Sequence, residues 1–463
     1  MQEVDTPSTV KGVPLAPGDI PLLGHGPRLL RDPLDWLQEC GRAEPVLRLR
    51  LGPRPAYLVC CRELVHDMLV GRVNSFDKGG SLLDRARDLL GNGLVTAGHT
   101  DHRRQRRLMQ PAFTPARTDS YDEVIREESA ALTRRWRAGQ EIDVLPELTS
   151  VTAKILGRTL LPTIDDRDAD HLSDCFQILL AGSFMRAAMP FTWIHRLPTP
   201  ANRRYNRAWA GAWAVADQAV AKARAQSTSS GLLHALITAG EADPEGAFSD
   251  EELRDQVTTL FIAGTETTAG TLAWLFHLLT LHPYVTKRLH RELDEVLGGR
   301  LAGPDTFPRL PYTRAVLLET MRVYPVVALL TRASSTDVDL GGHLFPTGTD
   351  FFFSAYLLHH DPTVFPDPDR FDPDRWTSPA GPAVRRAFIP FGAGKRKCIG
   401  DSLALTQATV ILSAIASRWH LTPAPGSHVR PRLRGTLTPA GLRLVTQARH
   451  SPRAGCGTPS QEG

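Results

Sequence analysis

The sequence lacks any run of apolar residues long enough to cross a membrane, which would need about 20 in succession. Its N-terminus also lacks the basic, apolar and small segments of a secretion signal. Cysteine is scarce, with 6 among 463 residues. None of the cysteines has zinc-site spacing, and the adjacent Cys60 and Cys61 are poor disulfide partners. We therefore expect a cytoplasmic protein with no membrane anchor.

The chain also lacks a strong net charge, a flexible linker and an internal repeat. A formal charge of +4 gives no support for binding nucleic acid. Without a linker, we expect a single domain over residues 12–449. The flanking segments, 1–11 and 450–463, are expected to be disordered, and the second is rich in glycine, proline and serine.

Helical patterns dominate what is present, so the sequence predicts a mainly α fold with small β-sheets. Helices are predicted at 31–40, 62–70, 103–110, 120–137, 170–180, 202–225, 249–281, 313–323 and 401–417. The longest begins with a capping box formed by Ser249 and Glu252 and ends before Pro283. Extended segments are predicted at 46–51, 57–60, 338–340 and 433–438.

One cysteine stands in a setting suited to an ionised sulfur. The basic run 395–397 leads directly into Cys398, and glycines lie on both sides of it. The helix predicted at 401–417 would direct its positive end toward the sulfur. A thiolate of this kind can bind iron, and the alternative is a core cysteine beside a basic turn.

The segment Phe391–Gly400 resembles the cysteine loop of the cytochrome P-450 family, Phe-x-x-Gly-x-Arg-x-Cys-x-Gly, at every fixed position. The resemblance implies the P-450 fold and a haem monooxygenase. It also implies that Cys398 is the axial ligand of a haem b iron, with Phe391, Arg396 and Gly400 beside the cofactor.

Two further motifs follow in the family's order. Glu319-Thr320-Met321-Arg322 resembles the family's Glu-x-x-Arg, and residues 365–376 resemble its proline-rich meander, which includes Arg375. Residues three apart share one helix face. The resemblance implies a structural triad of Glu319, Arg322 and Arg375, and the alternative is an ordinary surface ion pair.

The middle of the longest predicted helix carries the sequence Ala263-Gly264-Thr265-Glu266-Thr267-Thr268, which resembles the family's oxygen-binding signature. The resemblance implies that Ala263 and Gly264 leave space over the iron for O2. It assigns catalytic roles to Thr267, which steadies bound oxygen, and to Glu266, which helps to deliver protons. The alternative is a helix-packing notch with a back-bonding threonine.

The two propionates of a haem need cationic or hydrogen-bonding partners. The resemblance places His102 and Arg106, four residues apart on one helix face, at such positions. It places Arg332 and Arg396 there as well.

The pocket segments of the family are largely apolar here, which predicts an uncharged substrate. The chain resembles most the bacterial members that oxidise sesquiterpenes of the pentalenene type in secondary metabolism. A macrolide or a fatty acid is the alternative substrate, and a haem-binding sensor or carrier is an alternative of another class. Each predicted lining residue could instead be core: Phe76, Leu83, Phe184, Leu260, Val326, Val327 and Leu437.

The resemblance implies that electrons come from a ferredoxin and a ferredoxin reductase, since no reductase domain follows. Arginines at 103, 104 and 107 and lysines at 395 and 397 form a candidate docking surface for an acidic ferredoxin, or simply a solvated face. The acidic run 165–170 superficially resembles the magnesium motif of terpene synthases. Its spacing fails at Ala169, and we expect it to start a helix.

Overall fold

The computed structural model describes residues 10–51, 55–161, 165–188, 192–225, 231–241, 243, 246–379 and 381–449. Its α-helices are α1 (Gly26–Arg31), α2 (Pro33–Gly41), α3 (Arg62–His66), α4 (Ser81–Leu90), α5 (His99–Met109), α6 (Pro115–Asp119), α7 (Asp122–Arg135), α8 (Val144–Leu160), α9 (Asp166–Ala188), α10 (Pro200–Ala225), α11 (Leu232–Glu241), α12 (Asp250–Leu281), α13 (Pro283–Leu297), α14 (Pro311–Val323), α15 (Ala355–His359), α16 (Pro382–Ala387) and α17 (Asp401–Arg418).

The strands form small sheets beside these helices. They are β1 (Val46–Arg50), β2 (Pro55–Val59), β3 (Phe76–Asp77), β4 (Glu141–Asp143), β5 (Leu329–Ser334), β6 (Val338–Leu340), β7 (His343–Phe345), β8 (Asp350–Ser354), β9 (Trp419–Pro423), β10 (Arg430–Arg434), β11 (Thr436–Ala440) and β12 (Arg443–Ala448). The largest sheet has the order β1-β2-β8-β5-β3. The predicted fold class, mainly helical with small sheets, is therefore confirmed.

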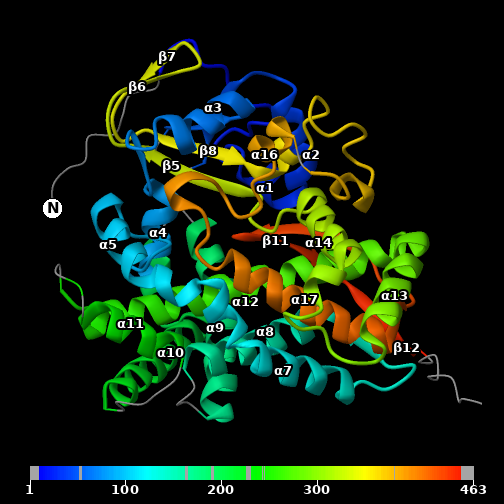
Figure 1. Cartoon of the computed structure of the whole chain (residues 1–463). Coiled ribbons are helices and arrows are strands. Elements are labelled where there is room, and N and C mark those ends of the chain that lie inside the picture. The colour runs from blue at the N-terminus through cyan, green and yellow to red at the C-terminus, as the bar shows by residue number, and fades with distance from the viewer. Residues whose placement is uncertain are drawn as a thin grey trace, which may run out of the picture.

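Helix α12 runs through the middle of the molecule (Figure 1), between the part that carries the large sheet and the helices α7 to α11. At 32 residues it is about 48 Å long. The predicted capping box is present, because the Glu252 amide donates to the Ser249 hydroxyl and the Ser249 amide donates to the Glu252 carboxylate. Helix α17, which follows the cysteine loop, packs against α12.

The extended segment predicted at 433–438 is β-structure, but it is divided between two strands. Its residues belong to β10 and β11, which pair antiparallel as a hairpin. Gly435 lies between the strands with φ of +83°, a left-handed conformation that glycine adopts without strain. The hairpin therefore brings residue 436 back toward the centre of the molecule, where β11 contacts α12.

Other boundaries differ from expectation without changing the architecture. Helix α5 begins at His99 rather than at 103, and α9 extends over 166–188 rather than 170–180. Asp165 accepts a hydrogen bond from the Asp168 amide at 2.8 Å, so the acidic run starts α9 as expected. The predicted disordered ends lie outside the described residues except for positions 10 and 11. Among the described helices, none is both long and apolar enough to span a membrane.

Candidate functional site

The cysteine loop is a compact turn held by its own backbone. The Cys398 amide donates to the Phe391 carbonyl at 2.8 Å, which closes the loop. Gly394 has φ of +67°, and a Cβ there would overlap the carbonyl oxygen of Leu69. The loop therefore packs directly on the π-helical turn Asp67–Gly71, and only glycine permits this approach.

Two observations place the Cys398 thiol against an internal space. Cys398 has exposed surface, yet burial raises the pKa of the thiol above its usual range. Both hold for a group that is surrounded by protein and opens onto a void rather than bulk water. Because the void has little solvent to stabilise charge, the neutral thiol is favoured over the thiolate.

The raised pKa corrects one expectation from the sequence. The basic run and the following helix do not by themselves ionise Cys398, because burial outweighs the lowering effects of the Gly400 amide, Arg106 and Lys397, and Asp401 adds to the rise. A bound metal cation would supply the missing stabilisation, since coordination deprotonates a thiol. The loop therefore fits a metal-bound thiolate better than a free one.

Four of the predicted haem contacts lie close to the loop or to one another. Arg396 donates to Asp77 at 2.5 Å and to the Ala97 carbonyl at 2.7 Å. Arg106 donates to the carbonyl of Lys397, next to Cys398. Burial, with the nearby Arg396 and Arg106, lowers the pKa of His102 to about 3, so its imidazole is neutral.

Arg332 belongs to the same cluster of buried cations. It is 5% exposed, and the hydrogen bond that its guanidinium makes within the described chain is to the Thr331 carbonyl at 2.8 Å. Burial and Arg396 together lower its pKa to about 10. A guanidinium has five N–H donors, so most of them remain for another partner.

Sequence reasoning missed a fifth member of this cluster, Lys78. Burial, followed by Arg332 and Arg396, lowers the pKa of its ammonium to about 7. Within the described residues, no acceptor lies within hydrogen-bond distance of its Nζ. The signal in the sequence was weak, because a single lysine after Phe76-Asp77 has no motif around it.

This cluster tests whether the chain fits the implied cofactor. Lys78, Arg332 and Arg396 gather near the carboxylate of Asp77, and buried cations are costly unless they are paired. The two propionates of a haem would supply the missing anions. The residues therefore fit a haem, with Cys398 to hold the iron and the cations to hold the propionates.

Most of helix α12 is buried, but one line of its residues, which we call the stripe, is partly accessible. Leu260, Ala263, Thr267 and Thr271 share one face by helical spacing, and each retains exposure at the centre of the molecule. The stripe therefore faces an internal space. The predicted oxygen-site residues Ala263 and Thr267 lie on it.

Gly264 has a packing role in addition to the one predicted. A Cβ there would lie 2.7 Å from Leu156 of α8, so its missing side chain permits close contact between α8 and α12. Thr267 donates its hydroxyl proton to the Ala263 carbonyl at 2.7 Å. The back-bonding alternative is thus observed, and it leaves the Thr267 oxygen as a hydrogen-bond acceptor.

Glu266 accepts a hydrogen bond from a residue in a distant part of the chain. Thr436, at the start of β11, donates its hydroxyl to Glu266 Oε1 at 2.8 Å. Burial raises the pKa of Glu266 above its usual range, while this hydrogen bond lowers it. A carboxyl group whose pKa is raised by burial holds its proton more firmly than a solvated one, which suits a group that exchanges protons.

The predicted structural triad is assembled and fully buried at its centre. Arg322 Nε and Nη2 donate to the two oxygens of Glu319 at 2.9 and 2.8 Å, and both side chains are 0% exposed. Arg375 Nε lies 3.3 Å from Glu319 as an ion pair rather than a well-aligned hydrogen bond. The sequence did not indicate Trp376, whose Nε1 donates to Glu319 at 2.8 Å.

The predicted pocket residues are placed unequally. Phe76 is 2% exposed and packs edge to face on Phe351 in the sheet core. Val326 and Leu437 are buried in one hydrophobic cluster, whereas Leu260 and Val327 keep partial exposure. Leu83 of α4 is buried, and the side chain of Phe184 lies outside the described set. Lining a pocket therefore stays a prediction, and for Phe76 the structure gives a core position instead.

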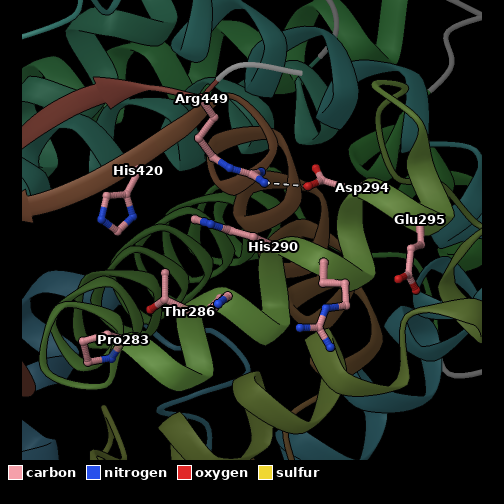
Figure 2. A pocket seen from close by; sticks show the side chains of 9 residues that line it. Pro283, Thr286, His290, Asp294, Glu295, His420 and Arg449 are labelled. Atoms are coloured by element: carbon pink, nitrogen blue, oxygen red, sulfur yellow. Dashed lines mark hydrogen bonds and ion pairs between the residues drawn. The ribbon is translucent and has the colours of Figure 1, made fainter. Parts of the chain in front are cut away.

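Another hollow of the molecule carries none of these residues. A pocket of about 540 Å³ lies between α13 and β9. Figure 2 shows the side chains that line it. Arg449 donates to Asp294 there at 2.7 Å, and His290 lies beside His420. No residue predicted for the site lines it, so it has no part in the site described above.

The candidate docking surface is smaller than expected. Arg104 pairs with Glu252 and Arg107 pairs with Asp243, so these two arginines are engaged within the chain. Arg103, Lys395 and Lys397 are exposed. On α5, Arg104 and Arg107 thus form ion pairs within the chain, whereas Arg103 is exposed to solvent.

The chain matches the sequence profile of the family described as cytochrome P450 over residues 14–446. It is 41% identical over 439 residues to cyclooctatin synthase of Streptomyces melanosporofaciens, with 94% of this chain and 95% of the relative covered. It is 42% identical over 438 residues to cyclooctat-9-en-7-ol 5-monooxygenase of the same organism, with coverage of 94% and 95%.

A third relative, pentalenene oxygenase of Streptomyces avermitilis, is 40% identical over 438 residues, with 94% of this chain and 97% of the relative covered. Among solved structures, the crystal structure of the cytochrome P450DA heme domain has a TM-score of 0.85 at 25% identity. It covers 96% of this chain and 99% of its own.

Proposed function

The chain belongs to the cytochrome P450 family and is a haem b-dependent monooxygenase, and from this premise we propose that its substrate is an uncharged terpenoid. The overall reaction consumes the substrate, O2, two electrons and two protons, and yields a hydroxylated product and water. A cyclic sesquiterpene of the pentalenene kind is the first compound to test, because one relative is named for pentalenene.

The observation that carries this proposal is the neutral stripe on α12. Leu260, Ala263, Thr267 and Thr271 face the internal space and include no charged group. The cations lie instead near Asp77, where Arg332 is buried and Lys78 is half-buried. A fatty acid would therefore have to bury its carboxylate without a cationic partner on this stripe, which is costly.

The haem, when bound, supplies the chemistry that activates O2 and oxidises the substrate. The protein would hold it through Cys398 and through the cations at Lys78, Arg332 and Arg396. Thr267 donates its hydroxyl proton to the Ala263 carbonyl, so its oxygen would accept rather than donate hydrogen bonds on the stripe. Glu266, in the same turn of α12, would exchange protons there, and burial raises its pKa above the usual range.

Substrate binding tests the proposed class directly. Pentalenene, lauric acid and a macrolide are each titrated into the ferric protein, and the shift of the iron spin state is followed by absorption. We expect a larger shift and a lower Kd for pentalenene. A larger response to lauric acid or to the macrolide than to any terpenoid would reject the substrate class and leave the family assignment standing.

The proposed role of Thr267 has a separate test. Thr267→Ala removes the hydroxyl on the stripe, and we expect haem binding to persist while more of the consumed electrons appear as peroxide. Thr271→Ala, one turn along the same stripe, is the matched control. Equal product yield per electron in Thr267→Ala and in the unmodified protein would remove Thr267 from catalysis.

Electrons come in our proposal from an acidic ferredoxin and its reductase. The exposed cations Arg103, Lys395 and Lys397 lie on the helix and the loop that flank Cys398. Positive charge at this surface would steer an acidic protein toward the haem. Arg104 and Arg107 contribute less charge to this surface because they pair with Glu252 and Asp243, and Asp401 likewise offsets part of the charge of Lys397.

A further inference from the structure

The hydrogen bond between Thr436 and Glu266 joins two parts of the chain that are 170 residues apart. One is the acidic position of the α12 signature. The other is the first residue of β11, directly after the hairpin turn at Gly435. The contact therefore links the proposed proton carrier to a hairpin.

The two oxygens of Glu266 have different surroundings. Oε1 accepts the Thr436 hydroxyl at 2.8 Å. Within the described chain, no donor reaches Oε2, and this oxygen is not sealed from solvent. One oxygen is thus fixed while the other stays available for proton exchange. Such a division suits a group that must hold one orientation and still pass protons.

The hairpin that carries Thr436 is itself anchored on both sides. Trp274 of α12 donates its Nε1 to the Leu437 carbonyl at 2.9 Å, and the Leu437 amide donates to the Val326 carbonyl at 2.7 Å. Thr436 is 9% exposed, so its hydroxyl has few other partners to choose from. The packing of β11 against α12 therefore fixes the position of Thr436.

We propose that Thr436 is a positioning residue, which holds the Glu266 carboxyl in the orientation needed for proton delivery. Proton delivery would then depend on how the β10–β11 hairpin packs against α12. A glutamate side chain without this bond would sample several rotamers. The proposal rests on the proposed role of Glu266. The proposal goes beyond that role by naming the residue that fixes the orientation of the Glu266 carboxyl group.

Five variants separate this role from a structural one. Thr436→Val and Thr436→Ala remove the donor, and Thr436→Ser keeps it. Thr438→Val removes a hydroxyl from the same strand and the same face, where no bond to Glu266 exists. Glu266→Gln removes the acid itself.

Two readouts are measured for each variant. The first is product formed per electron consumed with a terpenoid substrate, together with peroxide released. The second is the infrared carbonyl stretch of the Glu266 carboxylic acid in the ferric protein without substrate, identified by its absence in Glu266→Gln. The second readout does not depend on turnover.

We expect Thr436→Val and Thr436→Ala to release at least threefold more peroxide per electron. We also expect the carbonyl stretch to move to higher frequency, because the carbonyl oxygen loses a hydrogen bond. Thr436→Ser should restore both readouts, and Thr438→Val should change neither.

The outcomes distinguish the two levels of the proposal. If Glu266→Gln remains fully coupled, the proposed role of Glu266 fails. If Glu266→Gln is uncoupled but both hydroxyl-free variants at 436 match the unmodified protein in stretch and in coupling, the positioning role of Thr436 is overturned. A rise in peroxide that Thr436→Ser does not restore would also overturn it.

Discussion

The buried charges around Glu319 and those around Asp77 differ in how completely the protein supplies their hydrogen-bond partners. Each carboxylate oxygen of Glu319 accepts two hydrogen bonds, which come from Arg322, Trp376 and the Asp372 amide. Near Asp77, Lys78 and Arg332 keep donors without acceptors among the residues that the structure describes.

The difference distinguishes charged residues that stabilise the fold from charged residues that are available to bind a ligand. The Glu319 group is complete without any cofactor, since Arg322 also donates to the carbonyls of His359, Pro368 and Arg370. Substitutions there should act on folding. The Asp77 group is incomplete, so substitutions there should act on haem binding more than on the stability of the haem-free chain.

The largest effect is expected from Glu319→Gln. The substitution leaves the 0%-exposed Arg322 without its anion, and removing one partner of a buried pair costs about 3–5 kcal/mol. Denaturant unfolding of the haem-free protein measures the change. Asp217→Asn, which breaks the exposed pair with Arg254, should cost less than about 1 kcal/mol. An equal loss of unfolding free energy in the two variants would contradict the structural role of the Glu319 group.

A smaller loss is expected when Trp376→Phe removes one donor to Glu319. A hydrogen bond to a buried charged group is worth about 1.5–3 kcal/mol. The free energy of unfolding should fall by that amount, while the haem affinity of the folded protein stays unchanged. A weakened haem affinity at unchanged stability would show that the Glu319 group is not purely structural.

Lys78→Met tests the incomplete group. We expect the haem affinity to fall about tenfold, which corresponds to about 1.4 kcal/mol, because one cation facing the propionates is lost. Titration of haem into the haem-free protein measures this. Lys287→Met, at an exposed position of α13, is the control and should leave the affinity unchanged. An unchanged affinity in Lys78→Met would remove Lys78 from the haem site.

The same lysine predicts a pH dependence. In the folded haem-free chain the pKa of Lys78 is lowered to about 7, while the unfolded chain keeps the ordinary higher value. Between these values the unfolded state binds more protons, so stability of the haem-free protein should rise with pH. Haem affinity should fall over the same window. Lys78→Met should flatten both slopes.

The smallest effect on the fold is expected from Arg103→Glu. Stability should change by less than about 0.5 kcal/mol, because the side chain is exposed. Reduction at limiting ferredoxin should nevertheless slow severalfold and depend less on salt, since added salt screens the steering charge. Arg134→Glu on α7 is the control. Equal rates and salt slopes in both variants would leave Arg103 as a solvated residue.

Local sequence was sufficient where the structure depends on neighbours in the chain. The loop around Cys398 and the capping box at Ser249 involve residues within about ten positions of one another, so a motif could reveal them. The triad was also found, because the spacing of Glu319 and Arg322 and the Arg375 segment both match family patterns.

The parts that were missed depend on contacts across the fold. Lys78 and Thr436 reach the site from segments with no motif of their own, and Thr436 does so only because Gly435 turns the chain back. The engagement of Arg104 with Glu252 needed the packing of α5 on the start of α12. The burial that raises the pKa of Cys398 likewise arises from packing that local charge patterns do not reveal.

Glu252 belongs at once to the start of α12 and to the neighbourhood of α5. One of its oxygens accepts the Ser249 amide, and the other accepts Arg104, two residues from His102. A chimaeric enzyme that took α5 from one relative and α12 from another would inherit only half of this arrangement. Recombination within the family should therefore transfer residues 99–109 and 249–252 as one block, even though about 140 positions separate them in the gene.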